Sequence, residues 1–119
     1  MTAAIRGATT VKSNEKELIY EATSEMIKEI IDANNIDKND IVSIIFTATN
    51  DIDKAYPAVA VRNMGITEAA LMCVQEMYVD GSLRKCLRVM VTVEGDYDRK
   101  NLRHAYLRGA VGLRPDLRR

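Results

Sequence analysis

The sequence is poor in the side chains that enzymes most often use for proton transfer, covalent catalysis and metal binding. Its 119 residues include one histidine, two cysteines and no tryptophan. Cys73 and Cys86 are too few for a disulfide framework and lack the spacing of a metal site, so reduced thiols are expected. His104 has no catalytic partner nearby in the sequence, and a solvated or capping role is expected for it. The sequence therefore predicts neither a metal nor a cofactor.

Several motifs and long apolar runs are also missing. The chain has no Gly-x4-Gly-Lys phosphate loop, no GxGxxG dinucleotide motif and no HExxH zinc motif. No apolar run approaches the ~18 residues of a membrane helix, and the opening MTAAIRGATTV lacks the apolar centre of a signal peptide. Acid–base and covalent catalysis have little basis here. A cytoplasmic protein without a membrane partner is expected.

Charge is balanced over the whole chain but unevenly distributed along it. Residues 1–83 hold 7 basic and 13 acidic side chains, whereas residues 84–119 hold 10 basic and 4 acidic ones, and most of these basic residues are arginines. An arginine-rich segment can bind nucleic acid, or it can bind small carboxylates, which the guanidinium group matches bidentately. Because few aromatic residues accompany the arginines, a stacking surface for bases is disfavoured. Small-anion binding without nucleic acid is the favoured interpretation.

The hydrophobic pattern predicts one domain of mixed α and β structure, that is, an α+β fold. A long helix is expected over 14–34 because apolar residues recur there every three or four positions. The other expected elements are strands over 2–11, 41–49, 70–77 and 86–94, a helix over 57–64, a short helix or turn over 98–106, and an extended segment over 110–113. One long helix on a mixed sheet cannot cover both faces of that sheet, so an oligomer is expected.

Two charged residues lie within the most strand-like segment, residues 72–94. Alternation along 86–94 places Arg88 on the face opposite Leu87 and Val89, and Glu76 lies within the preceding apolar run. Burying either charge alone costs several kcal/mol. The alternatives that remain are a binding site, an interface, solvent exposure, or an ion pair between the two residues.

Six short segments are the most distinctive in the chain: IRGATTV (5–11), YPAVAVR (56–62), CVQEM (73–77), GSLRKCLRVMVTV (81–93), HAYL (104–107) and LRPDL (113–117). In this order, and nearly end to end, they resemble the monofunctional chorismate mutases of the small trimeric class. The resemblance implies a pseudo-α/β barrel assembled as a homotrimer, with active sites between subunits. It also implies the rearrangement of chorismate to prephenate, which is a Claisen-type pericyclic step in phenylalanine and tyrosine biosynthesis. That step requires no base, nucleophile or cofactor.

The resemblance further implies roles for individual residues. Arg88 is expected to be the catalytic donor to the ether oxygen, while Glu76 and Cys73 hydrogen-bond the ring hydroxyl. Arg6 is expected to bind a substrate carboxylate, and Tyr106 the other end of the substrate. The other residues expected at the substrate are Tyr56, Ala58, Arg62, Leu71, Met72, Val74, Gln75, Leu113 and Arg114.

The chain departs from this family pattern at three positions. Val59 stands where a lysine is expected, Met72 where a threonine is usual, and Tyr56 in place of a phenylalanine.

Two alternative functions are an enamine or imine hydrolase on the same trimeric architecture and a non-catalytic anion-binding protein. The residues at 114–119 are expected to form a mobile tail, and its closure over the site as a lid is a hypothesis.

Overall fold

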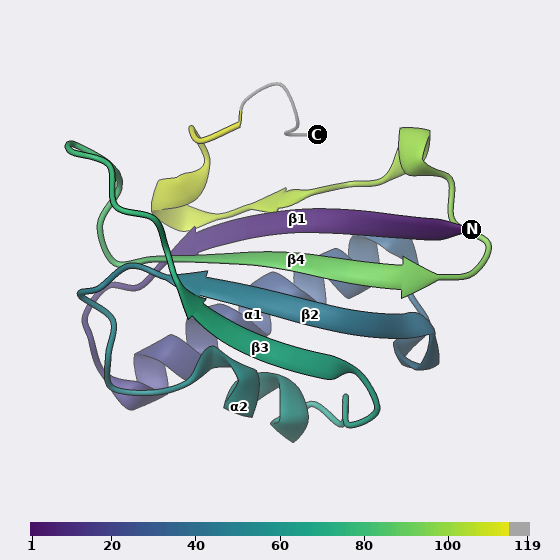
Figure 1. Ribbon diagram of the computed structural model, residues 1–119, viewed down its shortest axis with the longest axis horizontal. Coiled ribbons are helices and arrows are strands. Elements are labelled where there is room, and N and C mark those ends of the chain that lie inside the picture. Colours follow the sequence, from purple (N-terminus) through teal and green to yellow (C-terminus); the bar gives the residue numbers. More distant parts are fainter. Residues whose placement is uncertain (115–119) are drawn as a thin grey trace.

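A computed structural model describes residues 1–114 of the protein, which form a five-stranded sheet backed by helices (Figure 1). The order of strands across the sheet is β3-β2-β4-β1-β5. The central strand β4 is antiparallel to both of its neighbours, whereas the outer pairs β2–β3 and β1–β5 are parallel. The bounds of the strands are β1 (Thr2–Thr10), β2 (Ile41–Ala48), β3 (Ala70–Gln75), β4 (Cys86–Glu94) and β5 (Ala105–Tyr106).

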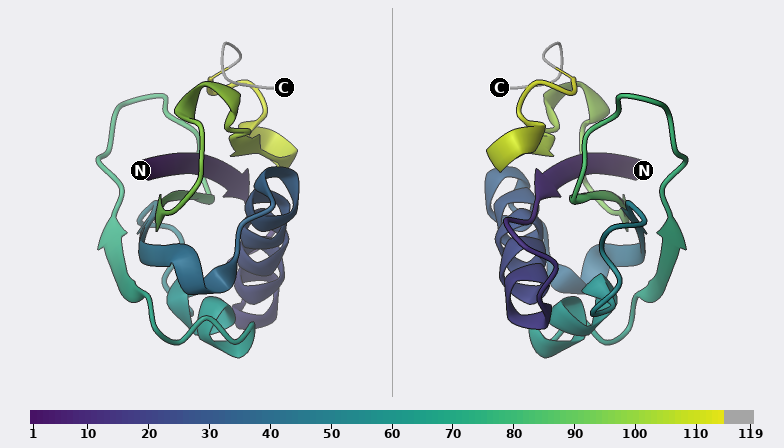
Figure 2. Two further views of the ribbon diagram at one scale, coloured as in Figure 1. Left: turned by 90° about the vertical axis from the view of Figure 1, so that its right-hand side faces the viewer. Right: turned by 90° about the vertical axis from the view of Figure 1, so that its left-hand side faces the viewer.

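Both helices, α1 (Lys16–Asn34) and α2 (Pro57–Asn63), lie on the same side of the sheet (Figures 1 and 2). In α1 the buried residues recur at the spacing of an amphipathic helix, and they are Ile19, Ala22, Thr23, Met26, Ile27 and Ile30. This confirms the predicted long helix. The apolar core therefore fills the space between the helices and one face of the sheet.

The start of α1 differs from the expected one. The helix begins at Lys16, and neither Ser13 nor Asn14 caps it, because the preceding residue Glu15 occupies the cap position without a side-chain bond. The Asn14 amide instead bonds the side chain of Asp53, 2.8 Å away. This contact ties the connection before α1 to the connection before α2.

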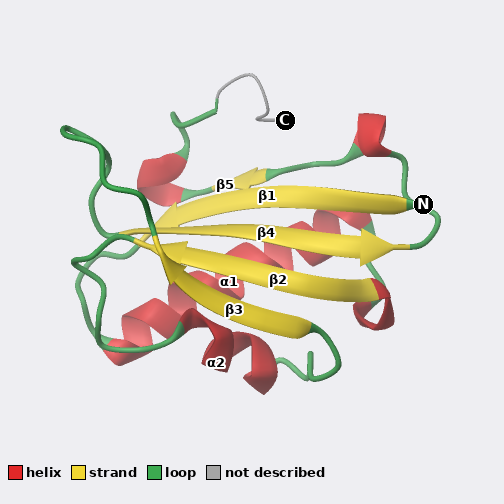
Figure 3. Cartoon of the chain, viewed as in Figure 1, coloured by secondary structure: helices red, strands yellow, loops and turns green. Residues whose placement is uncertain are grey.

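Helix α2 has the predicted start and stop. Pro57 occupies its first position, where the missing N–H costs nothing. Gly65 follows the helix with φ +87°, a conformation that glycine adopts without strain. The first turn of α2 lies near the ends of β2 and β3 (Figure 3), and Tyr56 and Pro57 line one cavity with Ala48 and Gln75.

Three predicted boundaries in the second half of the chain are wrong. The strand expected over 70–77 ends at Gln75. The helix or turn expected over 98–106 is a 3₁₀ turn over Arg99–Asn101 followed by strand β5. The segment expected to be extended over 110–113 instead begins at the last residue of a 3₁₀ turn, Arg108–Ala110, and continues as a turn and a bend. A two-residue strand is too short to show any periodicity. Of the predicted tail, residues 115–119 lie outside the described part of the chain.

Strand β5 can pair with β1 because Gly7 allows a close approach. A Cβ atom at this position would lie 3.0 Å from Ile30 Cδ1 and 3.1 Å from the carbonyl oxygen of Ala105. Gly7 and Ala105 are register partners, and the N–H of Leu107 donates to the carbonyl of Ala8 at 2.9 Å. The glycine thus lets one strand contact both α1 and the edge strand that carries Tyr106.

Candidate functional site

The sheet face that carries no helix presents a row of side chains that crosses all five strands. The register pairs Ala8 with both Tyr106 and Arg88, and it pairs Thr47 with both Arg88 and Val74. Because paired residues of neighbouring strands point to the same face, these five residues lie side by side. Ala8 is fully buried in this row and packs with Tyr106 and Ala110.

A cavity of about 280 Å³ lies over this row and over the adjacent row, which includes Arg6 and Met90. It brings together four residues that the sequence singled out, namely Arg6, Glu76, Arg88 and Tyr106. The rest of its lining consists of Gly7, Ile45, Thr47, Val89 and Met90. Arg6 and Tyr106, which are 100 positions apart in the chain, thus contribute to one pocket that holds two cations, one carboxylate and one phenol.

Glu76 reaches the pocket because it directly follows the end of β3. Its backbone N–H donates to the carbonyl of Ala48 at 2.9 Å, which fixes the first residue of the loop. The Glu76 carboxylate accepts a short hydrogen bond from the hydroxyl of Thr47. Its other oxygen lies 3.9 Å from Arg88 Nη1.

The ion pair between Arg88 and Glu76 leaves the guanidinium group available for a ligand. The Arg88 side chain is 41% exposed, and 3.9 Å is too long for a hydrogen bond. A pair of this kind contributes less than about 1 kcal/mol. Within residues 1–114 no hydrogen bond occupies the Arg88 donors, so an anion in the cavity can accept them bidentately.

The backbone of Arg6 is held by a hydrogen bond, while its side chain lines the cavity. The N–H of Arg6 donates to Nδ1 of His104 at 2.9 Å. The capping role expected for His104 agrees with this bond, which satisfies a strand N–H beside the short strand β5. The exposed Arg6 side chain also lines a shallower hollow beyond the cavity, together with Arg99.

The other candidate residues lie elsewhere in the chain. Tyr56, Cys73, Val74 and Gln75 line a second cavity of about 540 Å³ near the start of α2. Cys73 pairs with the buried Phe46 and so points to the helix side of the sheet, away from Arg88 and Glu76. Although β3 ends between Cys73 and Glu76, the two side chains line different cavities of one chain.

The remaining candidates occupy varied environments. Leu71 packs on the core, and Ala58 is buried within α2, whereas Arg62 on the same helix is exposed. Met72 is exposed on the sheet face that carries no helix, in the row of Met90 and Arg6. Leu113 is exposed and Arg114 half-buried, and neither lines the two cavities described above.

Sequence reasoning missed Thr47 as a part of the site. Thr47 is a polar residue near the end of an apolar strand, IVSIIFTA, which is a recognisable signal. Its partners Arg88 and Glu76, however, become neighbours only through the strand order, which the sequence does not reveal.

Cys86, at the start of β4, is the more deeply buried of the two free thiols. Burial raises its pKa to about 11, while the nearby Arg88 acts in the opposite direction and Glu76 in the same direction. The thiol is therefore neutral near pH 7, and it acts as a small apolar side chain in this position.

The fold and the cavity define a class: a small α+β protein with an arginine-lined pocket for an oxygen-rich anion. The family model for chorismate mutase type I matches residues 2–117. Chorismate mutase AroH of Bacillus subtilis (strain 168) is 42% identical to this chain over 98% of this chain and 93% of its own length. Chorismate mutase AroH of Thermus thermophilus is 40% identical over 98% of this chain and 97% of its own length. A solved chorismate mutase from Clostridium thermocellum is 52% identical, with a TM-score of 0.88 over 90% of this chain and 96% of its own.

The chain therefore belongs to the chorismate mutase type I family. Its activity is that of a chorismate mutase, an isomerase of aromatic amino-acid biosynthesis. The family assignment favours this activity over the imine hydrolase and the non-catalytic binder. In residues 1–114 no helix is long and apolar enough to cross a membrane, and no group of three or more His, Cys, Asp or Glu side chains is placed to hold a metal ion.

Proposed function

We propose that the cavity around Arg88 is the place where chorismate rearranges to prephenate. In this step one C–O bond breaks while one C–C bond forms, and the ether oxygen gains negative charge in the transition state. A fixed guanidinium group at that oxygen binds the transition state better than the substrate and so lowers the barrier. The observation that carries the proposal is the single cavity that joins Arg88 with Arg6, Glu76 and Tyr106.

The other polar residues of the cavity are assigned roles by the charge or hydrogen bond that each side chain offers to the substrate. Arg6 binds a substrate carboxylate at the rim, and the Tyr106 hydroxyl bonds the far end of the substrate. Glu76, oriented by Thr47, accepts a hydrogen bond from the ring hydroxyl. Together these contacts hold a flexible substrate in its reactive conformer, which is worth several kcal/mol of the barrier.

A neighbouring copy of the chain supplies the rest of the site in a homotrimer. This is supported by the separation of Tyr56 and Cys73 from Arg88 within one chain, because a ligand can contact both groups only between two copies. It is also supported by the sheet face without helices, on which Met72 is 58% and Met90 42% exposed. Large apolar side chains on an uncovered sheet face are typical of a subunit interface.

Under this assignment the wall residues Ala58, Leu71, Met72 and Gln75 belong to the partner's side of the cleft. Arg62, Leu113 and Arg114 lie at its edge, where the two arginines add positive potential for the carboxylates. The chain works as one domain over residues 1–119. The free state of both cysteines supports a cytoplasmic location.

The test is the loss of the chorismate diene absorbance in the presence of the purified chain, measured beside Arg88→Ala. The expected loss in kcat is at least about 10²–10³-fold, the effect of removing one oxyanion donor. Arg103→Ala, which removes an exposed arginine outside the cavity, is the control and should retain kcat within about threefold. Sedimentation should give the mass of three chains. An Arg88→Ala protein with wild-type kcat would exclude the proposed role.

A further inference from the structure

Both ends of the loop between β3 and β4 are attached to one short segment, residues 48–51. At the first end, the N–H of Glu76 donates to the carbonyl of Ala48 at 2.9 Å. At the second end, the N–H of Thr49 donates to the carbonyl of Cys86 at 3.1 Å, and the N–H of Cys86 donates to the Thr49 hydroxyl oxygen at 3.0 Å. The loop carries Glu76 at its start, and Arg88 follows three residues after its end at Lys85.

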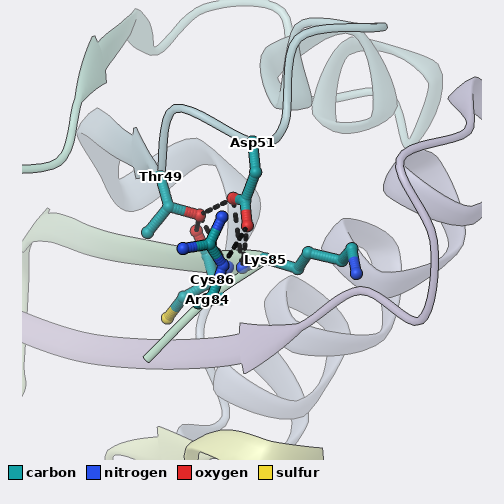
Figure 4. A network of polar contacts seen from close by, with 5 residues as sticks. All are labelled: Thr49, Asp51, Arg84, Lys85 and Cys86. Atoms are coloured by element: carbon teal, nitrogen blue, oxygen red, sulfur yellow. Dashed lines mark hydrogen bonds and ion pairs between the residues drawn. The ribbon is translucent and has the colours of Figure 1, made fainter. Parts of the chain in front are cut away.

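Asp51 is the centre of the attachment at the second end (Figure 4). Its two carboxylate oxygens accept the N–H of Lys85 at 3.1 and 3.0 Å, and one of them accepts the Thr49 hydroxyl at 2.5 Å. Arg84 adds an ion pair at 3.5 Å. Burial alone would raise the pKa of Asp51, but these hydrogen bonds and Arg84 outweigh it and hold the pKa below its ordinary value. The carboxylate is therefore ionised and acts as an acceptor.

The backbone that Asp51 holds is one that the chain does not favour on its own. Lys85 has φ +46°, in the left-handed region that residues other than glycine rarely adopt. The loop also has little packing of its own, since Met77, Tyr78 and Val79 are 56–78% exposed. The position at which β4 begins thus depends on the bonds from residues 48–51, together with the N–H of Val11, which donates to the carbonyl of Lys85 at 2.8 Å.

We propose that Asp51 is a positioning residue for the mutase reaction, which sets the place of Arg88 relative to Glu76 by holding Lys85 and Cys86. The inference rests on the proposed role of Arg88. Arg88 must meet the ether oxygen while Glu76 meets the ring hydroxyl, so the spacing of the two side chains is part of the catalytic geometry. A misplacement of about 1 Å in such a geometry can reduce turnover about 10²-fold.

The first variant is Asp51→Ala, assayed with Asp37→Ala as a matched control. Asp37 also accepts a backbone N–H, that of Asn39 at 2.9 Å, but at the opposite end of β2 and outside the cavity. Asp51→Ala is expected to reduce kcat by about 10–10²-fold with KM within about twofold. Asp37→Ala is expected to lower the melting temperature without changing kcat. Equal kcat for the two variants would overturn the proposal.

Two further variants separate positioning from folding. Asp51→Asn keeps one acceptor oxygen for the N–H of Lys85, so it should recover most of the lost kcat. If Asp51→Ala does not fold, Thr49→Val is the substitute, because it keeps the side-chain volume and removes the hydroxyl; about a tenfold loss in kcat is expected. Failure of Asp51→Asn to recover activity, or an unaffected kcat in Thr49→Val, would count against the proposal.

A double-mutant cycle with Arg88→Ala completes the test. If Asp51 acts through Arg88, Asp51→Ala should change the residual kcat of Arg88→Ala by less than about twofold. Fully additive losses would show that Asp51 acts elsewhere, and the inference would fail while the role of Arg88 stands. If Arg88→Ala alone retains wild-type kcat, the proposed function fails and this inference fails with it.

Discussion

The two faces of the sheet are built from the same strands, yet they differ in nearly every property. On the helix side, Ile5, Ile44, Phe46 and Leu87 have no exposed surface, and their partners are apolar. On the opposite side, the residues that alternate with them include Arg6, Thr47, Arg88 and Met90, which are half-buried or exposed. One face therefore contributes stability through burial, and the other leaves its polar groups to a ligand or a second chain.

The difference teaches how a small protein can hold charged side chains beside a core. In a strand the side chains alternate, so Arg88 is rigidly placed by Leu87 and Val89 although it does not join them. The charge stays at the surface of the single chain, where its desolvation costs little. Under the proposed function it becomes enclosed only when substrate and partner cover it, and the substrate anion then compensates the burial.

The largest expected effect is a contrast between substitutions at two consecutive residues of β2 that lie on opposite faces of the sheet. Phe46→Ala removes a fully buried ring and should lower the free energy of unfolding by about 3–5 kcal/mol. Thr47→Val, on the other face, should change that free energy by less than about 0.5 kcal/mol. It should instead reduce kcat/KM about tenfold or more, because Glu76 loses the hydroxyl that donates to it.

Denaturant unfolding and chorismate turnover, measured on both variants, check this contrast. Thr47→Ser, which retains the hydroxyl, is the control for the second variant and should keep most of the activity. A strongly destabilised Thr47→Val protein, or one with unchanged turnover, would contradict the division of the two faces.

A smaller effect concerns Cys86, and it depends on pH. Its pKa is raised by burial from 9.0 to about 11, so the thiol stays neutral in the folded chain at a pH where the unfolded chain ionises it. The stability it contributes is complete below about pH 9 and decreases as the pH rises from 9 towards 11. The free energy of unfolding should therefore fall over this range, and the fall should be smaller in Cys86→Ala.

Thiol labelling gives an independent check on the same comparison. At pH 8 an alkylating reagent should modify the half-buried Cys73 well before Cys86, because only the thiolate is nucleophilic. Cys73→Ala identifies the labelled position by mass. Rapid labelling of Cys86 in the folded chain would contradict its burial.

Much of the fold could be predicted because long elements carry a clear pattern. The stripe of α1, the Pro57 start of α2 and the alternation of β4 are all visible in the sequence, since burial on one side imposes a period. Strand β5 could not be predicted in the same way. It forms because Gly7 admits a neighbour, and this tertiary effect leaves no mark on residues 105–106 themselves.

The candidate site was predictable in its residues but not in its arrangement. The segments around Arg6, Glu76, Arg88 and Tyr106 carry the family resemblance, and the structure joins these four in one cavity. The proximity of Glu76 and Arg88 to Thr47 follows from the strand order β3-β2-β4, which no local pattern encodes. The distance of Cys73 from this cavity likewise depends on which face of β3 packs against the helices.

The central claim is that Arg88 binds the transition state more tightly than the ground state. The most direct test compares wild type with Arg88→Met in their dissociation constants for prephenate and for a stable bicyclic dicarboxylate that mimics the transition state. The account predicts that affinity for the mimic falls by at least about 10²-fold, far more than affinity for prephenate. Equal losses for both ligands would mean that Arg88 only holds the substrate, and the account of catalysis would be wrong.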